Sequence, residues 1–140
     1  MSEYPQQKLK KEWIQESISD ETVTWAKSFG KYLQSHENKS EPLSTSQIRR
    51  FFGEIKRIQA DPIKYKNDIP LLKAKLAYSV GRDIKKDRNG QVFNKTKIKE
   101  FYEVLESGID FVRKEKKEDF INFVKIVESI VAYHKYFGGE

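Results

Sequence analysis

Cysteine is absent from this chain of 140 residues, and that absence excludes several classes of protein. Without cysteine there are no disulfides, no thiol nucleophile and no cysteine-ligated zinc or iron–sulfur site. Long apolar runs are missing too, since no stretch approaches the 18 residues that a membrane-spanning helix requires. The polar start Met1–Gln7 is followed by no apolar segment of the kind that a secretory signal contains. We therefore expect a cytoplasmic protein with no membrane partner.

Catalytic residue types are scarce as well. The chain has 2 histidines, His36 and His134, which lie far apart without metal-ligating neighbours at helical spacing. His134 follows an apolar stripe, which favours a packed, hydrogen-bonded histidine. No glycine-rich phosphate-binding loop is present. Asp83 and Asp87 leave open a metal-dependent nuclease, although ion pairing with the lysines and arginine around them is the simpler interpretation. We expect no enzymatic activity, no metal and no cofactor.

What the chain does contain is apolar residues at helical spacing. Aromatic residues make up 13% of the chain, which excludes disorder along its whole length. No alternating strand pattern of useful length appears. The fold expected is an all-α, single-domain bundle of about five helices over residues 1–140, in which 1–18 is either poorly ordered or a short helix. The spacing predicts helices over Glu21–Gln34, Ser44–Ala60, Asp68 to beyond Val80, Asn94–Val112 and Glu118–Gly138, with a turn at Asp87–Gly90.

The start of the second of these helices is the clearest local signal. Ser44 and Gln47 have the spacing of a capping box, in which each side chain satisfies an unpaired backbone amide of the first turn. Leu43 and Ile48 occupy the two positions of a hydrophobic staple. Pro62 predicts the end of the helix, because proline disfavours the helical conformation of the residue before it.

The net charge of +6 is unevenly distributed. Residues 44–99 hold 15 Lys and Arg against 5 Asp and Glu, a net charge of +10, whereas the remainder has a net charge of −4. Such a basic segment favours a nucleic-acid partner, since lysine and arginine neutralise phosphates and release counterions. The simpler alternative is a solvated, lysine-rich surface.

Helical periodicity places much of this charge on two helix faces. Opposite its apolar stripe, the 44–60 helix carries Arg49, Arg50, Gly53, Lys56 and Arg57. A glycine inside a helix costs about 1 kcal/mol relative to alanine. Gly53 is explained equally well by close approach of a phosphate backbone or by contact with another helix.

The following helix repeats the arrangement. One face is expected to carry Lys75, Ser79, Arg82 and Lys86, with Tyr78 at its edge. Two adjacent basic faces form a candidate groove for phosphates, to which hydroxyl groups add neutral hydrogen bonds. The connection Ala60–Ile69 is too long for a DNA-reading helix-turn-helix, and no RNA-binding aromatic strand is present. The pattern therefore favours binding of a nucleic-acid backbone without reading of its bases.

Three segments in this order and spacing resemble the small subunit of type III-A CRISPR effector complexes, the Csm2 family of the Csm complex. They are Ser46–Phe52 (SQIRRFF), Leu71–Arg82 (LLKAKLAYSVGR) and Glu128–Gly139 (ESIVAYHKYFGG). The resemblance covers most of the chain from Ser44 to Gly139, and the first 40 residues carry no matching motif. Ala74 departs from the family, in which proline occupies this position as often as not.

The resemblance implies a small helical protein without catalytic residues that acts in antiviral defence. Copies are expected to stack along the backbone subunits and flank the duplex of guide RNA and target RNA, with basic residues facing the phosphates. Self-association is therefore expected, including a homodimer of the free protein as an open alternative. The residues that carry over are Arg49, Arg50, Lys56 and Arg57 in the first segment's helix, and Lys73, Lys75 and Arg82 in the second. A helical adaptor that binds only protein is the alternative function.

Overall fold

The computed structural model describes residues 8–36 and 40–138 of the chain. It confirms the expected all-α single domain and, of the two alternatives for residues 1–18, shows a short helix within the described part of that segment. It adds a small hairpin. The helices are α1 (Lys11–Gln15), α2 (Asp20–Leu33), α3 (Thr45–Gln59), α4 (Leu71–Arg82), α5 (Ile98–Phe111) and α6 (Lys117–Tyr136). A 3₁₀ turn, η2 (Lys66–Asp68), precedes α4, and the strands β1 (Ile84–Lys86) and β2 (Val92–Asn94) form an antiparallel pair.

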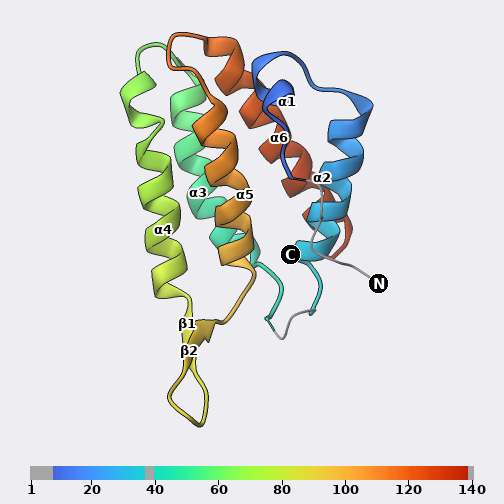
Figure 1. Cartoon of the computed structure of the whole chain (residues 1–140), viewed down its shortest axis with the longest axis vertical. Helices are drawn as coiled ribbons and strands as arrows, with labels where there is room; N and C mark the ends of the chain where they lie inside the picture. The colour runs from blue at the N-terminus through green and yellow to red at the C-terminus, as the bar shows by residue number, and fades with distance from the viewer. Residues whose placement is uncertain (1–7, 37–39, 139–140) are drawn as a thin grey trace.

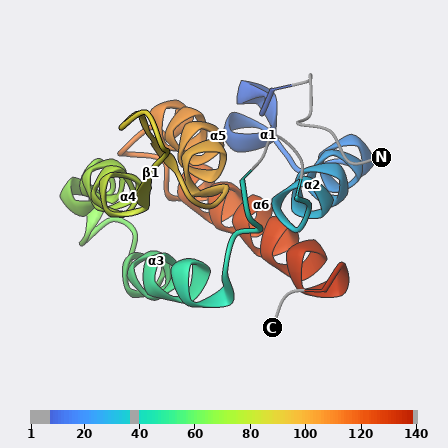
Figure 2. The ribbon, with the colours of Figure 1, turned by 90° about the horizontal axis from the view of Figure 1, so that it is seen from below.

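Helix α6 is the centre of the bundle. It packs against α1, α2, α3 and α5, while α4 lies at the outer edge against α3 and α5 (Figures 1 and 2). Its buried side chains supply much of the core, among them Phe120, Phe123, Val127 and Ile130. No helix within the described residues is long and apolar enough to cross a membrane.

Helices α2 and α6 approach each other closely. A Cβ atom added at Gly30 in α2 would lie 2.8 Å from the Cβ of Tyr133 and 2.9 Å from the backbone nitrogen of His134 in α6. Any side chain at this position would therefore push the two helices apart. On the same helix, Trp25 and Phe29 are buried and stack with their ring centroids 5.6 Å apart.

The predicted start of α3 is confirmed. The hydroxyl oxygen of Ser44 accepts a hydrogen bond from the backbone N–H of Gln47 at 3.2 Å, and Gln47 Oε1 accepts one from the backbone N–H of Ser44 at 2.8 Å. Leu43 and Ile48, the predicted staple, are both buried. These contacts fix where α3 begins and therefore which way its basic residues point.

The segment after α4 differs from the prediction. The helix ends at Arg82, and the backbone leaves the helical conformation at Asp83 (φ −92°, ψ 57°). Lys86 therefore lies on β1 and not on the face of α4, which corrects the expected helical spacing. The physical reason is that the Asp83 carboxylate accepts hydrogen bonds from both the backbone N–H and the hydroxyl of Thr96, each at 2.9 Å. These bonds fasten the base of the hairpin across the end of the helix.

Helix α5 begins later than the sequence pattern predicts. Asn94 does not cap this helix, which begins at Ile98, four residues later. Its side-chain amide instead donates to the backbone carbonyls of Val80 and Asp83, at 2.9 and 3.1 Å, and so satisfies the C-terminal end of α4. Strands of three residues are too short to show an alternating pattern, which is why the hairpin was not predicted.

Candidate nucleic-acid interface

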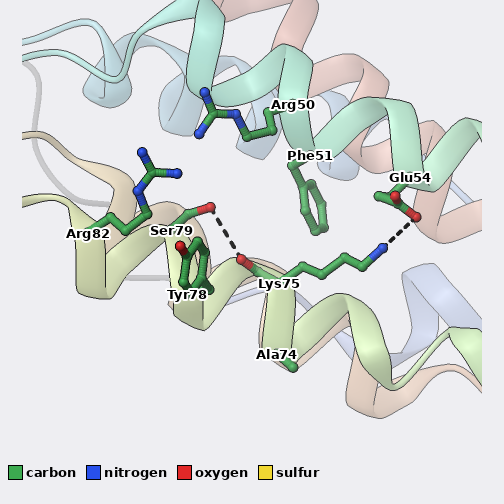
Figure 3. A pocket seen from close by; sticks show the side chains of 8 residues that line it. All are labelled: Arg50, Phe51, Glu54, Ala74, Lys75, Tyr78, Ser79 and Arg82. Atoms are coloured by element: carbon green, nitrogen blue, oxygen red, sulfur yellow. Dashed lines mark hydrogen bonds and ion pairs between the residues drawn. The ribbon is translucent and has the colours of Figure 1, made fainter.

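Helices α3 and α4 lie side by side and leave a groove of about 350 Å³ between them (Figure 3). Residues at spacings of three and four on each helix point into it, because such residues share a helix face. The groove has an apolar floor, where Phe51 is buried and packs edge-to-face on Phe101. Its lining residues are Arg50, Phe51, Glu54, Ala74, Lys75, Tyr78, Ser79 and Arg82.

One end of the groove is closed by an ion pair. Lys75 Nζ of α4 lies 2.8 Å from Glu54 Oε2 of α3, and the bridge links the two helices (Figure 3). Arg57 also contacts this carboxylate, at 3.3 Å. The hydrogen bond from Lys75 is the main reason that the pKa of Glu54 is lowered from its ordinary value. The carboxylate therefore stays ionised at neutral pH, and charge is balanced at this end.

The other end of the groove has unbalanced positive charge. The guanidinium groups of Arg50 and Arg82 extend toward each other from the two helices (Figure 3). Among the described residues, neither has a carboxylate within 4.0 Å. The Arg82 guanidinium carbon lies 5.6 Å from the ring centroid of Tyr78, which is 67% exposed. This end therefore presents two free guanidinium forks beside an exposed aromatic ring.

The remaining predicted residues lie outside this groove, and three of them are ion-paired. Lys56 contacts Glu128 of α6 at 3.0 Å, Lys73 contacts Asp110 of α5 at 2.6 Å, and Arg57 contacts Asp68 at 2.9 Å. All three pairs are partly exposed, so each contributes little to stability. To bind a phosphate, each of these side chains must first release a carboxylate.

Arg49 and Lys86 are exposed but lie elsewhere on the surface. Arg49 lines a separate hollow near the C-terminal end of α6, together with Ser46 and Gly138. Lys86 is on the hairpin, opposite Val92. The predicted residues thus fall into a converging set, which is Arg50, Lys75 and Arg82, and a dispersed set, which is Arg49, Lys56, Arg57, Lys73 and Lys86.

A comparison with protein families identifies the family of the chain. The model of the family described as Csm2 Type III-A matches residues 16–140. The chain belongs to the Csm2 Type III-A family. No curated protein matches it, and no solved structure does. The resemblance seen in the three sequence segments is therefore confirmed, and the match extends to the helix α2 region, where no motif was visible. This Csm2 chain is a structural small subunit that associates with other subunits of a type III-A CRISPR effector complex.

The carboxylates proposed as a nuclease site in this Csm2 chain are both occupied by structural hydrogen bonds. Asp83 binds Thr96, and Asp87 Oδ1 accepts the backbone N–H groups of Asn89 and Gln91, each at 2.9 Å. The two residues flank opposite ends of β1, about 13 Å apart for four extended residues. Among the described residues no three metal-ligating side chains cluster. The ion pairing expected around them is also absent from the described part of the chain.

His134 is packed, as predicted. It is 2% exposed, and its Nε2 donates to the backbone carbonyl of Leu43 at 2.6 Å. Burial lowers the pKa of His134 below its ordinary value, an effect that Lys135 adds to and that the bond to Leu43 opposes. The imidazole is therefore neutral at physiological pH and holds the segment before α3 against α6.

Lys97 has a structural role that the sequence pattern does not predict. It is fully buried, and its Nζ donates to the backbone carbonyl and the hydroxyl of Ser40, each at 2.8 Å, while lying 5.2 Å from the ring centroid of Tyr32. Its charge was counted in the basic segment, but it is unavailable to an RNA. Nothing in the local sequence distinguishes it from the exposed Lys95 and Lys99.

The structure separates the two explanations for Gly53. A Cβ atom added there would meet nothing within 4 Å, so contact with another helix within the described residues is wrong. The glycine lies on the exposed side of α3, between the row of Arg49 and Lys56 and the row of Arg50 and Arg57. A bare backbone there leaves room for close approach of a partner.

Proposed function

We propose that this Csm2 chain holds RNA within the type III-A complex by its phosphate backbone and does not cut it, while packing along the backbone subunits in antiviral defence. The ligand is the guide RNA or target RNA. The observation that carries the proposal is the pair Arg50 and Arg82, which reach from two helices into one groove without a carboxylate partner within the described residues. Lys75 also lines the groove but is paired with Glu54, and Gly53 opens the adjacent surface of α3.

Guanidinium groups suit this role physically. The planar fork of arginine matches the oxygens of a phosphate and can donate two parallel hydrogen bonds. Contacts to phosphate fix the position of a nucleic acid but carry no base information. A site built from Arg50 and Arg82 therefore accepts any guide sequence, which is what a subunit shared by all guides requires.

The absence of catalysis has its own support. His134 is buried and neutral, and the carboxylates of Asp83 and Asp87 are engaged by Thr96 and by the hairpin turn. None of these groups is free to move a proton or hold a metal ion at the groove. Magnesium-dependent RNA cleavage by the purified chain, lost on Asp83→Ala, would contradict this part of the proposal.

Removing the two guanidinium groups tests the site. The double variant Arg50→Ala/Arg82→Ala should bind labelled single-stranded RNA more weakly than the wild-type chain. It should also reduce the slope of log affinity against log salt by about 1.4, since each phosphate contact to a single strand contributes about 0.7. Fluorescence anisotropy at several salt concentrations measures both quantities, and circular dichroism confirms that the helices remain.

The matched control is Lys10→Ala/Lys66→Ala. It removes the same charge from side chains that are ion-paired to Glu21 and Glu115, away from the groove. The control should keep the wild-type salt slope. An equal loss in both double variants would show that only net charge matters. Normal RNA binding by the Arg50/Arg82 variant, with failure to join the complex, would make the groove a protein contact and favour the adaptor.

A further inference from the structure

The hairpin projects from the bundle beside the groove. Its strands pair in the register Lys85 with Phe93 and Lys86 with Val92. The turn is closed by the bond from Asp87 N–H to the Gln91 carbonyl at 3.0 Å, and Gly90 supplies the left-handed conformation that it needs (φ 79°). Figure 1 shows the hairpin extending beyond the ends of the helices.

The hairpin is strongly basic. Residues 84–95 contain four Lys and Arg against one Asp, a net charge of +3. The aspartate, Asp87, is held by two backbone N–H groups of the turn. Within the described part of the chain, none of the basic side chains has a carboxylate within 4.0 Å. They are Lys85, Lys86, Arg88 and Lys95.

Apolar side chains are exposed on the same hairpin. Ile84, Val92 and Phe93 are 53%, 55% and 41% exposed. Since directly paired residues share a face of the ladder, Phe93 lies beside Lys85 on one face, and Val92 lies beside Lys86 on the other. A two-stranded hairpin this short has little stability of its own and buries none of these side chains in the core. These side chains are therefore accessible to another molecule.

An aromatic ring among unpaired lysines is typical of surfaces that bind single-stranded nucleic acid, where bases stack on the ring. The hairpin also adjoins the groove. A hollow of about 160 Å³ lined by Arg50, Arg82 and Asp83 reaches its base. Lys85 follows Arg82 by three residues, a chain distance of at most about 11 Å. One RNA strand can therefore contact both.

We propose that the hairpin is a second RNA contact, in which an unpaired base stacks on Phe93 while Lys85, on the same face of the ladder, binds an adjoining phosphate. This rests on the proposed function, because the same strand enters the groove at Arg50 and Arg82. The site selects unpaired RNA, since a base within a duplex cannot lie flat against the ring.

Phe93 variants of the full chain test the proposal. Phe93→Ala should weaken binding of single-stranded RNA about fivefold or more, the lower end of base–aromatic stacking. Its salt slope should be unchanged, because no charge is lost, and binding of a duplex of the same sequence should change less than twofold. Phe93→Tyr should bind as the wild type does, whereas Phe93→Leu should bind as weakly as Phe93→Ala. Val92→Ala, an exposed residue of the same strand, is the control and should stay within twofold.

The outcomes separate the two proposals. Wild-type affinity in Phe93→Ala together with weak binding in Arg50→Ala/Arg82→Ala overturns the stacking site and leaves the groove. Wild-type affinity in both overturns both. Full RNA binding by Phe93→Leu, or weakened assembly into the complex with unchanged RNA affinity in Phe93→Ala, shows that the hairpin is an apolar contact for protein. Quenching of 2-aminopurine in the RNA on binding to the wild-type chain, absent in Phe93→Leu, reports stacking directly.

Discussion

The two helix pairs α2–α6 and α3–α4 are built in opposite ways. In the first, the backbones approach so closely that Gly30 has no room for a Cβ atom beside Tyr133. In the second, the bridge between Glu54 and Lys75 links the helices above the Phe51 floor, and an open groove of about 350 Å³ remains between them. The closely packed pair stabilises the fold, and the separated pair leaves side chains exposed in the groove where we propose that RNA binds.

The two helix pairs also differ in the surroundings of their glycines. Gly30 and Gly53 both lie inside helices, where glycine costs about 1 kcal/mol relative to alanine. At Gly30 that cost is offset by the packing that the missing side chain permits. At Gly53 no packing against the described residues offsets it, since the surrounding space is open. Under the proposed function, the open backbone at Gly53 allows RNA to approach the helix.

Removing a phenyl ring from each pair should give the largest difference. Phe29→Ala should lower the free energy of unfolding by about 3–5 kcal/mol, because the ring is fully buried and leaves a cavity. Phe51→Ala should cost less, about 2 kcal/mol, because its ring borders the groove and water can occupy the space. Urea denaturation measures both. Equal losses would mean that α3 and α4 are as tightly packed as α2 and α6.

The glycines give the next largest effect, with opposite signs. Gly30→Ala should destabilise the chain by about 1–3 kcal/mol, the usual cost of overpacking. Gly53→Ala should stabilise it by up to about 1 kcal/mol through helix propensity. If RNA approaches the backbone at this point, the same Gly53→Ala variant should bind RNA more weakly despite its greater stability. A stabilised variant with unchanged RNA affinity would place the RNA away from Gly53.

The parts of this fold that can be predicted from the sequence are those fixed by contacts between residues close together in the chain. The capping box of Ser44 and Gln47 acts through neighbouring residues, so its spacing alone locates the start of α3. Asn94 has the same chemistry as a cap but serves the end of α4, because Val80 and Asp83 lie close only in the folded chain. Hydrogen bonds of this kind, between residues distant in the sequence, determine where the hairpin forms. They leave no periodic pattern in the sequence from which it could be predicted.

The site shows a similar limit. Helical spacing correctly groups Lys75, Ser79 and Arg82 on one face of α4. Helical spacing does not tell which acidic residues the other helices bring near. One of them, Glu128 of α6, neutralises Lys56. A count of basic residues therefore overstates the charge that is free to bind RNA, and only the packing of the helices separates the available charges from the paired ones.

The smallest expected effect is a difference in pH dependence between the two pairs. At the end of the α2–α6 contact, buried His134 has a lowered pKa, so the unfolded chain binds the proton more readily than the folded one. The free energy of unfolding should therefore fall as the pH drops below about 6.5, by at most about 1.4 kcal/mol per pH unit for one group. At the α3–α4 groove, the lowered pKa of Glu54 means that its stabilisation is present above 4.5 and is lost only below that value.

Urea denaturation between pH 7.5 and pH 5 measures the contribution of His134 separately, because the contribution of Glu54 is lost only below pH 4.5. His134→Gln should flatten the dependence of stability on pH in this range, whatever its effect on absolute stability. The exposed His36, changed to Gln, is the control and should keep the wild-type slope. Glu100, whose pKa is raised mainly by burial, acts in the opposite direction, so only the difference between the wild type and the His134 variant isolates the histidine. A wild-type chain equally stable at pH 7.5 and 5, with the His134 variant the same, would show that protonation of this histidine is not coupled to the contact between α2 and α6.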